Sequence, residues 1–143
     1  MKVLLTGSTG QLGYEIINSK PNDIELYHPT RMELDLLDYK SCERFILEKR
    51  PEWIINTAAY TLVDRAEIER DQAKNINSFA PLAFTKAINK IDCNLLHLST
   101  DYVFNGKQNK PYQEKQATCP INYYGYTKAL SEALIEKEIS DKS

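Results

Sequence analysis

KVLLTGSTGQLG, residues 2–13, joins an apolar run of strand length, 2–7, to three glycines. Gly7, Gly10 and Gly13 stand three residues apart, where the strand ends and a helix is predicted to begin. The chain must turn sharply there, and residues without side chains let phosphate oxygens approach the backbone and the free N–H groups of the helix. The bare pattern is a weak signal that a tight strand-to-helix turn would also explain. Its place after the first strand favours dinucleotide binding.

Three further apolar runs have the length of strands: residues 24–29, 52–59 and 93–100. Each is nearly continuous rather than alternating, which is typical of parallel strands covered on both faces. Residues 33–38 are considered as a short additional strand. With helical stretches between them, these runs predict an α/β fold, a doubly wound parallel sheet of the Rossmann-like kind.

Apolar residues at helical spacing mark two stretches between the strands. In residues 39–50, Asp38 is placed to cap the first turn and Pro51 to stop the helix. Residues 71–90 carry a long apolar stripe, which predicts one long helix.

The composition is that of an ordinary globular domain, and we treat residues 1–143 as one domain. The chain is 42% hydrophobic and 27% charged, and its formal net charge of -2 gives no electrostatic reason to expect nucleic acid as a partner. The chain opens without the apolar run of a signal peptide and has no apolar segment of membrane length. The sequence therefore predicts a cytoplasmic protein without a membrane partner.

The cysteines give no sign of a metal site. Cys42, Cys93 and Cys119 are odd in number, lack CxxC spacing and have no nearby histidine to complete a zinc site. We interpret them as reduced, mostly packing residues.

Tyr124 and Lys128 stand four positions apart in a helix that is predicted to begin after Asn122 and to run to about residue 139. A phenol has an unperturbed pKa of about 10 and needs a neighbouring cation to relay protons at neutral pH. A lysine one turn later on the same helix face can supply that charge. An isolated pair of this kind is more often a helix-surface pair, so the glycine loop is what favours a catalytic role.

The residues after the second predicted strand bear on the cofactor. Folds that bind NAD commonly place an acid there for the ribose 2′-hydroxyl. Here the segment is HPTR, residues 28–31, which has no acid. Arg31 favours the 2′-phosphate of NADPH, although a solvated loop arginine explains it nearly as well.

Four motifs in order, TGSTGQLG, INTAAYTLVDRAE, HLSTDYVFNG followed by PY and E, and YYGYTKALSE, resemble the extended short-chain dehydrogenase/reductases. They are most similar to the dTDP-4-dehydrorhamnose reductases. The resemblance runs from Lys2 to about Glu138 but covers only the first half of such an enzyme, because family members continue into further strands and a smaller sugar-nucleotide domain. We therefore expect a partial Rossmann-like domain, truncated before its last strands and its substrate domain, and inactive by itself.

The resemblance implies a catalytic set of Thr100, Tyr124 and Lys128. In such an enzyme Tyr124 protonates the C4 keto oxygen of the sugar while NADPH or NADH delivers hydride to that carbon. Lys128 lowers the pKa of the tyrosine and holds the nicotinamide ribose, and the Thr100 hydroxyl binds the carbonyl or the phenol.

The resemblance also implies binding residues. Those on the cofactor side are Gly7, Thr9, Gly10, Gln11, Leu12, Gly13, Arg31, Asp35, Leu36, Ala58, Ala59, Tyr60, Asn77, Tyr124 and Lys128. Asp35 and Leu36 would flank the adenine, and Asn77 would support the site through backbone hydrogen bonds. Those on the substrate side are Asp101, Tyr102 and Phe104, although the two aromatic rings fit a small satellite core equally well.

Three functions remain open. The first is reduction of dTDP-4-dehydrorhamnose to dTDP-L-rhamnose, with a nucleotide sugar as the partner. The others are a noncatalytic regulatory subunit like the β subunit of methionine adenosyltransferase, and a sugar-nucleotide epimerase. The three catalytic positions favour an enzyme, and STDYVF favours the reductase. Whether Mg²⁺ or a homodimer is needed is not decided by the sequence.

Overall fold

Four parallel strands form the sheet of the computed structural model, which describes residues 1–141. The elements in chain order are β1 (Lys2–Thr6), α1 (Gln11–Ser19), β2 (Glu25–Tyr27), α2 (Tyr39–Lys49), β3 (Trp53–Asn56), α3 (Val63–Ala66), α4 (Arg70–Lys74), the π-helix η1 (Asn75–Phe79), α5 (Ala80–Ile88), β4 (Asn94–His97), the 3-10 helix η2 (Asp101–Val103) and α6 (Tyr123–Ser140).

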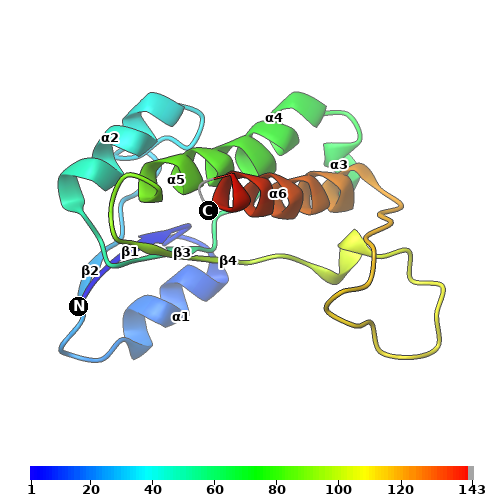
Figure 1. Cartoon of the computed structure of the whole chain (residues 1–143), viewed down its shortest axis with the longest axis horizontal. Helices are drawn as coiled ribbons and strands as arrows, with labels where there is room; N and C mark the ends of the chain where they lie inside the picture. Colours follow the sequence, from blue (N-terminus) through cyan, green and yellow to red (C-terminus); the bar gives the residue numbers. More distant parts are fainter. Residues whose placement is uncertain (142–143) are drawn as a thin grey trace.

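The strands lie in the order β2-β1-β3-β4, so the chain crosses over after β2 to reach the other side of β1. Val3 of β1 is in register with Leu26 on one side and Trp53 on the other. Helix α1 lies on one face of the sheet, and α2, α5 and α6 lie on the opposite face (Figure 1). This arrangement confirms the predicted Rossmann-like fold.

The core lies between the sheet and the α2–α5 layer. Leu4 and Ile54 of the central strands pack with Ile46 of α2 and Phe84 of α5, and all four are fully buried. The edge strand β4 is less buried than the central strands, since Leu96 is 49% exposed. The prediction of strands covered on both faces therefore fits β1 well and β4 poorly.

Helix α2 begins and ends where its flanking residues predict. The Asp38 carboxylate accepts a hydrogen bond from the Ser41 N–H at 2.9 Å. The helix ends at Arg50, which has a left-handed backbone with a φ of 44°, directly before Pro51. Both ends of α2 are set by residues next to them in the sequence, so the sequence alone predicted them.

The prediction of a strand over residues 33–38 is wrong. The Thr30 carbonyl accepts hydrogen bonds from the N–H groups of Glu33 and Leu34, and the Asp35 carboxylate accepts one from the Leu37 N–H at 3.0 Å. These turn bonds use backbone and side-chain groups that a strand would leave for its neighbour.

The stripe over residues 71–90 forms three helical segments instead of one regular helix. Pro81 has no N–H to donate to a preceding carbonyl, and the turn before it is the π-helix η1. The wider turn contains Asn77, whose side chain is buried.

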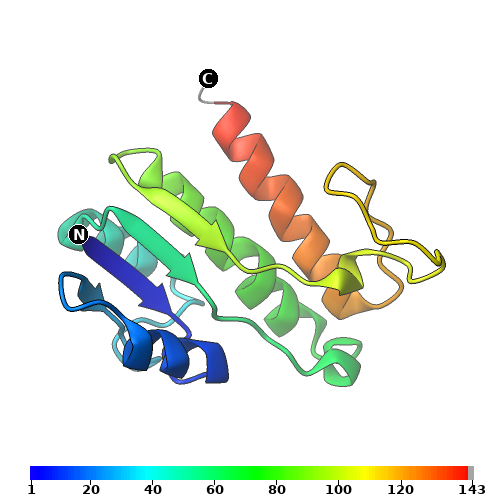
Figure 2. The same ribbon diagram turned by 90° about the horizontal axis from the view of Figure 1, so that it is seen from below.

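Loops follow the carboxyl ends of the strands. The last three strands are shorter than predicted, and η2 and the first turn of α6 lie beyond this end of the sheet (Figure 2). None of the helices among residues 1–141 combines the length and the apolar character that a membrane span requires.

Candidate functional site

A cavity of about 590 Å³ opens at the carboxyl ends of β1 and β3. The cofactor-side residues that line it are Gly7, Thr9, Gly10, Gln11, Leu12, Gly13, Arg31, Asp35, Leu36, Ala58 and Ala59. They come from the first turn of α1 and from the loops after β1, β2 and β3, which parallel strands bring to one edge of the sheet.

The glycine loop packs closely against neighbouring backbone atoms. Gly7 has a φ of 77°, and a Cβ on it would lie 2.6 Å from the Ala58 nitrogen. A Cβ on Gly13 would overlap the Gly7 carbonyl oxygen and lie 2.8 Å from the Ser8 Cα. Gly10 caps α1 without a side-chain hydrogen bond, so the first N–H groups of α1 are available to an anion. This cradle fits the pyrophosphate of a dinucleotide.

The loop after β2 forms the far wall of the cavity. The Ser8 hydroxyl donates to the Pro29 carbonyl at 3.1 Å, which ties this loop to the glycine loop. Arg31 and Asp35 are both exposed on the cavity wall. A cation at this point suits a ligand with an additional negative group.

Asn56 joins three strands at their carboxyl ends, and the sequence analysis missed it. Its Oδ1 accepts hydrogen bonds from the Thr6 hydroxyl at 2.6 Å and the Ala58 N–H at 3.2 Å. Its Nδ2 lies 2.9 Å from Nδ1 of His97. A polar residue at the end of an apolar strand was the signal that could have identified Asn56.

Tyr60 and Asn77 lie behind the cavity rather than in its lining. Asn77 is fully buried; its Oδ1 accepts from the Tyr60 N–H at 2.7 Å and its Nδ2 donates to the Tyr60 carbonyl at 3.1 Å. The same Nδ2 lies 3.0 Å from the Thr127 hydroxyl of α6. Asn77 therefore joins the loop after β3 to α6.

Tyr124 lies beside Thr100, beyond the end of β4. The Tyr102 ring contacts the Tyr124 ring edge-on, with centroids 5.7 Å apart. Burial raises the pKa of Tyr124, and the nearby Thr100 side chain partly opposes that rise. The charge of Asp101 adds to the rise in pKa.

Lys128 follows one turn later, and its side chain is buried. Its ammonium donates to the Leu98 carbonyl and lies 3.4 Å from Nε2 of His97. Burial lowers the pKa of Lys128 to about 8, while the charge of Glu132 opposes that shift.

That Lys128 lowers the pKa of Tyr124 stays a prediction; in this structure burial raises that pKa and Thr100 is the group that lowers it. The shared helix face places the two residues close, but a buried ammonium needs an acceptor and takes the Leu98 carbonyl. Thr100 is the residue whose contact favours the phenolate.

His97 completes a buried polar network at the end of β4, and sequence reasoning missed it as well. Because the Asn56 Oδ1 accepts from two donors, its Nδ2 must be the group that donates to Nδ1 of His97. Nε2 then carries the imidazole hydrogen and can donate to the Ser131 hydroxyl at 3.0 Å. Burial and the charge of Lys128 lower the pKa of His97 to about 3, so the ring is neutral at pH 7.

The predicted substrate-side residues divide into two environments. Asp101 is exposed, and Tyr102 is 46% exposed beside Tyr124. Phe104 instead stacks on Tyr112, with centroids 4.2 Å apart and planes 7° from parallel. That stack is the satellite packing that the sequence also allowed.

The three cysteines differ in burial. Cys42, Cys93 and Cys119 are free, and burial raises the pKa of Cys42 to about 12. Within residues 1–141 no group of three or more histidine, cysteine, aspartate or glutamate side chains is arranged to hold a metal ion.

Comparisons with known proteins agree with this geometry. The family model described as the RmlD substrate binding domain matches residues 1–142. A dTDP-4-dehydrorhamnose reductase of Burkholderia thailandensis is 36% identical over 141 residues, which cover 99% of this chain and 47% of that protein.

Two solved structures of such reductases superpose closely on this chain. The reductase of Clostridium acetobutylicum gives a TM-score of 0.92 at 35% identity, over 96% of this chain and 49% of that one. The reductase of Bacillus anthracis, solved in complex with NADP, gives 0.91 at 35% identity, over 95% and 49%. This chain spans about half the length of the curated relatives it matches.

Proposed function

Because the chain belongs to the RmlD substrate binding domain family, we propose that the protein that carries it reduces the C4 keto group of dTDP-4-dehydrorhamnose to give dTDP-L-rhamnose. The observation that carries this proposal is the position of Tyr124 beside Thr100 and the Tyr102 ring, with Lys128 one turn away on the same helix. The glycine cavity at the same end of the sheet provides a place for the cofactor.

In this mechanism Tyr124 is the general acid. Because its pKa is raised, the phenol is protonated at neutral pH and can donate its proton to the keto oxygen. A bound NADPH or NADH supplies the hydride for the keto carbon. As the phenolate forms, the Thr100 side chain favours it, since the influence of Thr100 is to lower the pKa of Tyr124.

Lys128 is the group we assign to the nicotinamide ribose. At neutral pH its ammonium is protonated, because a pKa of about 8 lies above the solution pH. It is held near the end of β4 by the Leu98 carbonyl, so a ribose hydroxyl has to reach it there. The neutral His97 beside it adds no competing positive charge.

A coupled assay tests the proposed function. The native gene product that contains this chain should oxidise NADPH when dTDP-4-dehydrorhamnose is added and should not oxidise it without the keto sugar. Retention of tightly bound NAD with no net oxidation of NADPH would point to an epimerase instead. Absence of turnover together with copurification of a larger partner would point to a regulatory subunit.

We also propose that the cofactor is NADPH rather than NADH, because Arg31 lines the cavity and residues 28–31, directly after β2, include no acid. Arg31→Ala should weaken NADPH binding by about tenfold, the value of one charge-assisted hydrogen bond to a phosphate, and leave NADH binding unchanged. Fluorescence titration with both cofactors measures this ratio. Arg44→Ala, an exposed arginine on α2, is the matched control. Equal losses for the two cofactors would contradict the assignment.

The cytoplasmic location stays a prediction from the sequence.

A further inference from the structure

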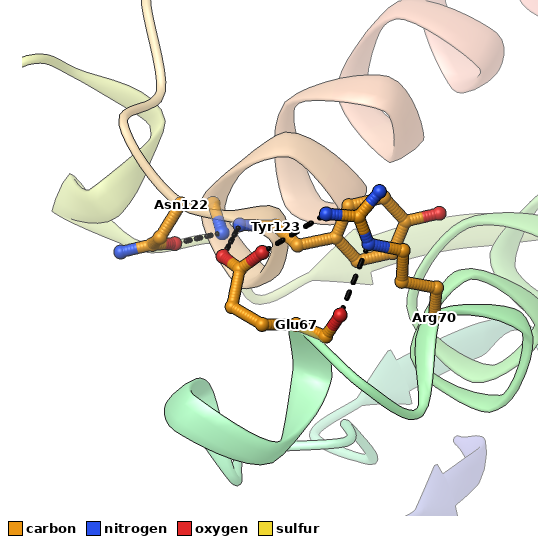
Figure 3. Close-up of polar contacts among 5 residues, drawn as sticks. Glu67, Arg70, Asn122 and Tyr123 are labelled. Carbon is orange, nitrogen blue, oxygen red and sulfur yellow. Dashed lines mark hydrogen bonds and ion pairs between the residues drawn. The ribbon is translucent and has the colours of Figure 1, made fainter.

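The first turn of α6 carries Tyr124, and its backbone N–H groups have no partners within the helix. Two of these groups are satisfied by side chains. The Gly125 N–H donates to the Asn122 Oδ1 at 2.7 Å, which is a local cap. The Tyr123 N–H donates to the Glu67 Oε1, also at 2.7 Å, across 56 residues of sequence (Figure 3). The start of α6 is therefore attached to the turn between α3 and α4.

Arg70 holds the Glu67 carboxylate in this position. Its guanidinium lies 3.3 Å from the other carboxylate oxygen, Oε2, and its Nε donates to the Glu67 carbonyl at 3.1 Å. The same guanidinium lies over the Tyr123 ring, 4.9 Å from the ring centroid (Figure 3). Arg70 thus contacts both partners of the Glu67–Tyr123 hydrogen bond.

Polar contacts of this kind fix the orientation of α6 about its own axis. Its apolar residues are hardly segregated to one face, so apolar burial alone does not define which side of the helix faces the sheet. One turn later, two polar contacts hold the second turn of the helix. The Ser78 hydroxyl donates to the Thr127 carbonyl, and the Asn77 side chain donates to the Thr127 hydroxyl. The first turn, with the phenol, has its own long-range contact through Glu67.

We propose that Glu67, braced by Arg70, is a positioning residue for Tyr124. The Glu67–Tyr123 hydrogen bond sets the position of the first turn, and that turn places the phenol against Thr100 and the Tyr102 ring. This inference rests on the proposed role of Tyr124 as the proton donor. Glu67 touches none of the reacting groups and acts through the backbone of the preceding residue.

A pair of substitutions separates hydrogen bonding from charge. Glu67→Ala removes the acceptor and should lower kcat by about tenfold, because small displacements of a catalytic group are costly. Glu67→Gln keeps a carbonyl oxygen for the Tyr123 N–H and should keep kcat within about threefold of wild type. The dissociation constant for NADPH should change by less than about twofold in both variants, because the glycine cavity is built by other loops. A general loss of folded protein would instead lower the apparent kcat and the number of NADPH molecules bound per chain together.

Glu43 supplies the matched control. It forms an exposed ion pair with Lys90 on the α2 side of the molecule, so Glu43→Ala and Glu43→Gln repeat both chemical changes away from α6. Neither should alter kcat. If Glu67→Ala fails to fold, Arg70→Met carries the test, since it removes the brace and keeps most of the side chain. It should lower kcat by an intermediate amount.

Two nuclear magnetic resonance measurements test the positioning without relying on turnover. In Glu67→Ala the Tyr123 amide should exchange with solvent faster, and the ring-to-ring nuclear Overhauser effect between Tyr102 and Tyr124 should weaken. Glu67→Gln should preserve both signals. Wild-type signals in Glu67→Ala, or in Arg70→Met where that variant stands in, would overturn the inference. If the protein had no reductase activity but Glu67→Ala still caused these spectral changes, the proposed function would be wrong and the positioning of Tyr124 by Glu67 would still hold.

Discussion

Tyr124→Phe should reduce the turnover number for the keto sugar by at least about a hundredfold, within the range that general acid catalysis contributes. The substitution removes only the hydroxyl, which lies beside Thr100 and has a raised pKa. The ring and its edge contact with Tyr102 remain, so the fold and the affinity for NADPH should be preserved. Steady-state kinetics with a parallel cofactor titration measure both quantities.

Tyr126→Phe is the control for this experiment. Tyr126 lies on the same helix, is 43% exposed and packs its ring near that of Tyr123. Loss of its hydroxyl should leave turnover unchanged. If the two variants turned over the keto sugar at the same rate as wild type, Tyr124 would not be the proton donor.

Gly13→Ala should weaken NADPH binding by at least about tenfold and destabilise the fold by about 1–3 kcal/mol, as overpacking does. The added Cβ would overlap the Gly7 carbonyl oxygen, which is backbone and cannot swing aside. Helix α1 would have to move away from the glycine loop, and its first N–H groups would leave the cavity. Fluorescence titration and chemical denaturation report the two effects.

Alanine substitutions at two other glycines serve as comparisons for Gly13→Ala. Gly10→Ala should be milder, because its Cβ would lie 3.3 Å from the Gly7 carbonyl oxygen. Gly106 has a φ of 67° and no atom within 4 Å of the point where a Cβ would lie, so Gly106→Ala should cost about 1–2 kcal/mol of backbone strain and no affinity for NADPH. Equal affinity in the Gly13 and Gly106 variants would show that the cradle does not bind the cofactor.

The site could be predicted from sequence in part, and the limits have physical causes. The glycine cradle was identifiable, because its residues are neighbours in sequence and their spacing carries the geometry. Thr100 and Tyr124 are 24 positions apart, and only the resemblance to a known family joined them before the structure did. The contact between the Lys128 ammonium and the Leu98 carbonyl could not be predicted from the sequence, because it depends on which acceptor the fold places beside the buried ammonium.

The sequence by itself determined the alternation of strands and helices, the turn at Gly7 and the caps at Asp38 and Asn122, since each depends on residues a few positions apart. The tertiary structure decided the His97 network and the attachment of Glu67 to α6, which join groups 31 to 56 positions apart. Local patterns set backbone conformation through short-range sterics and hydrogen bonds. The partner of a buried polar group is set by the packing that brings distant segments together.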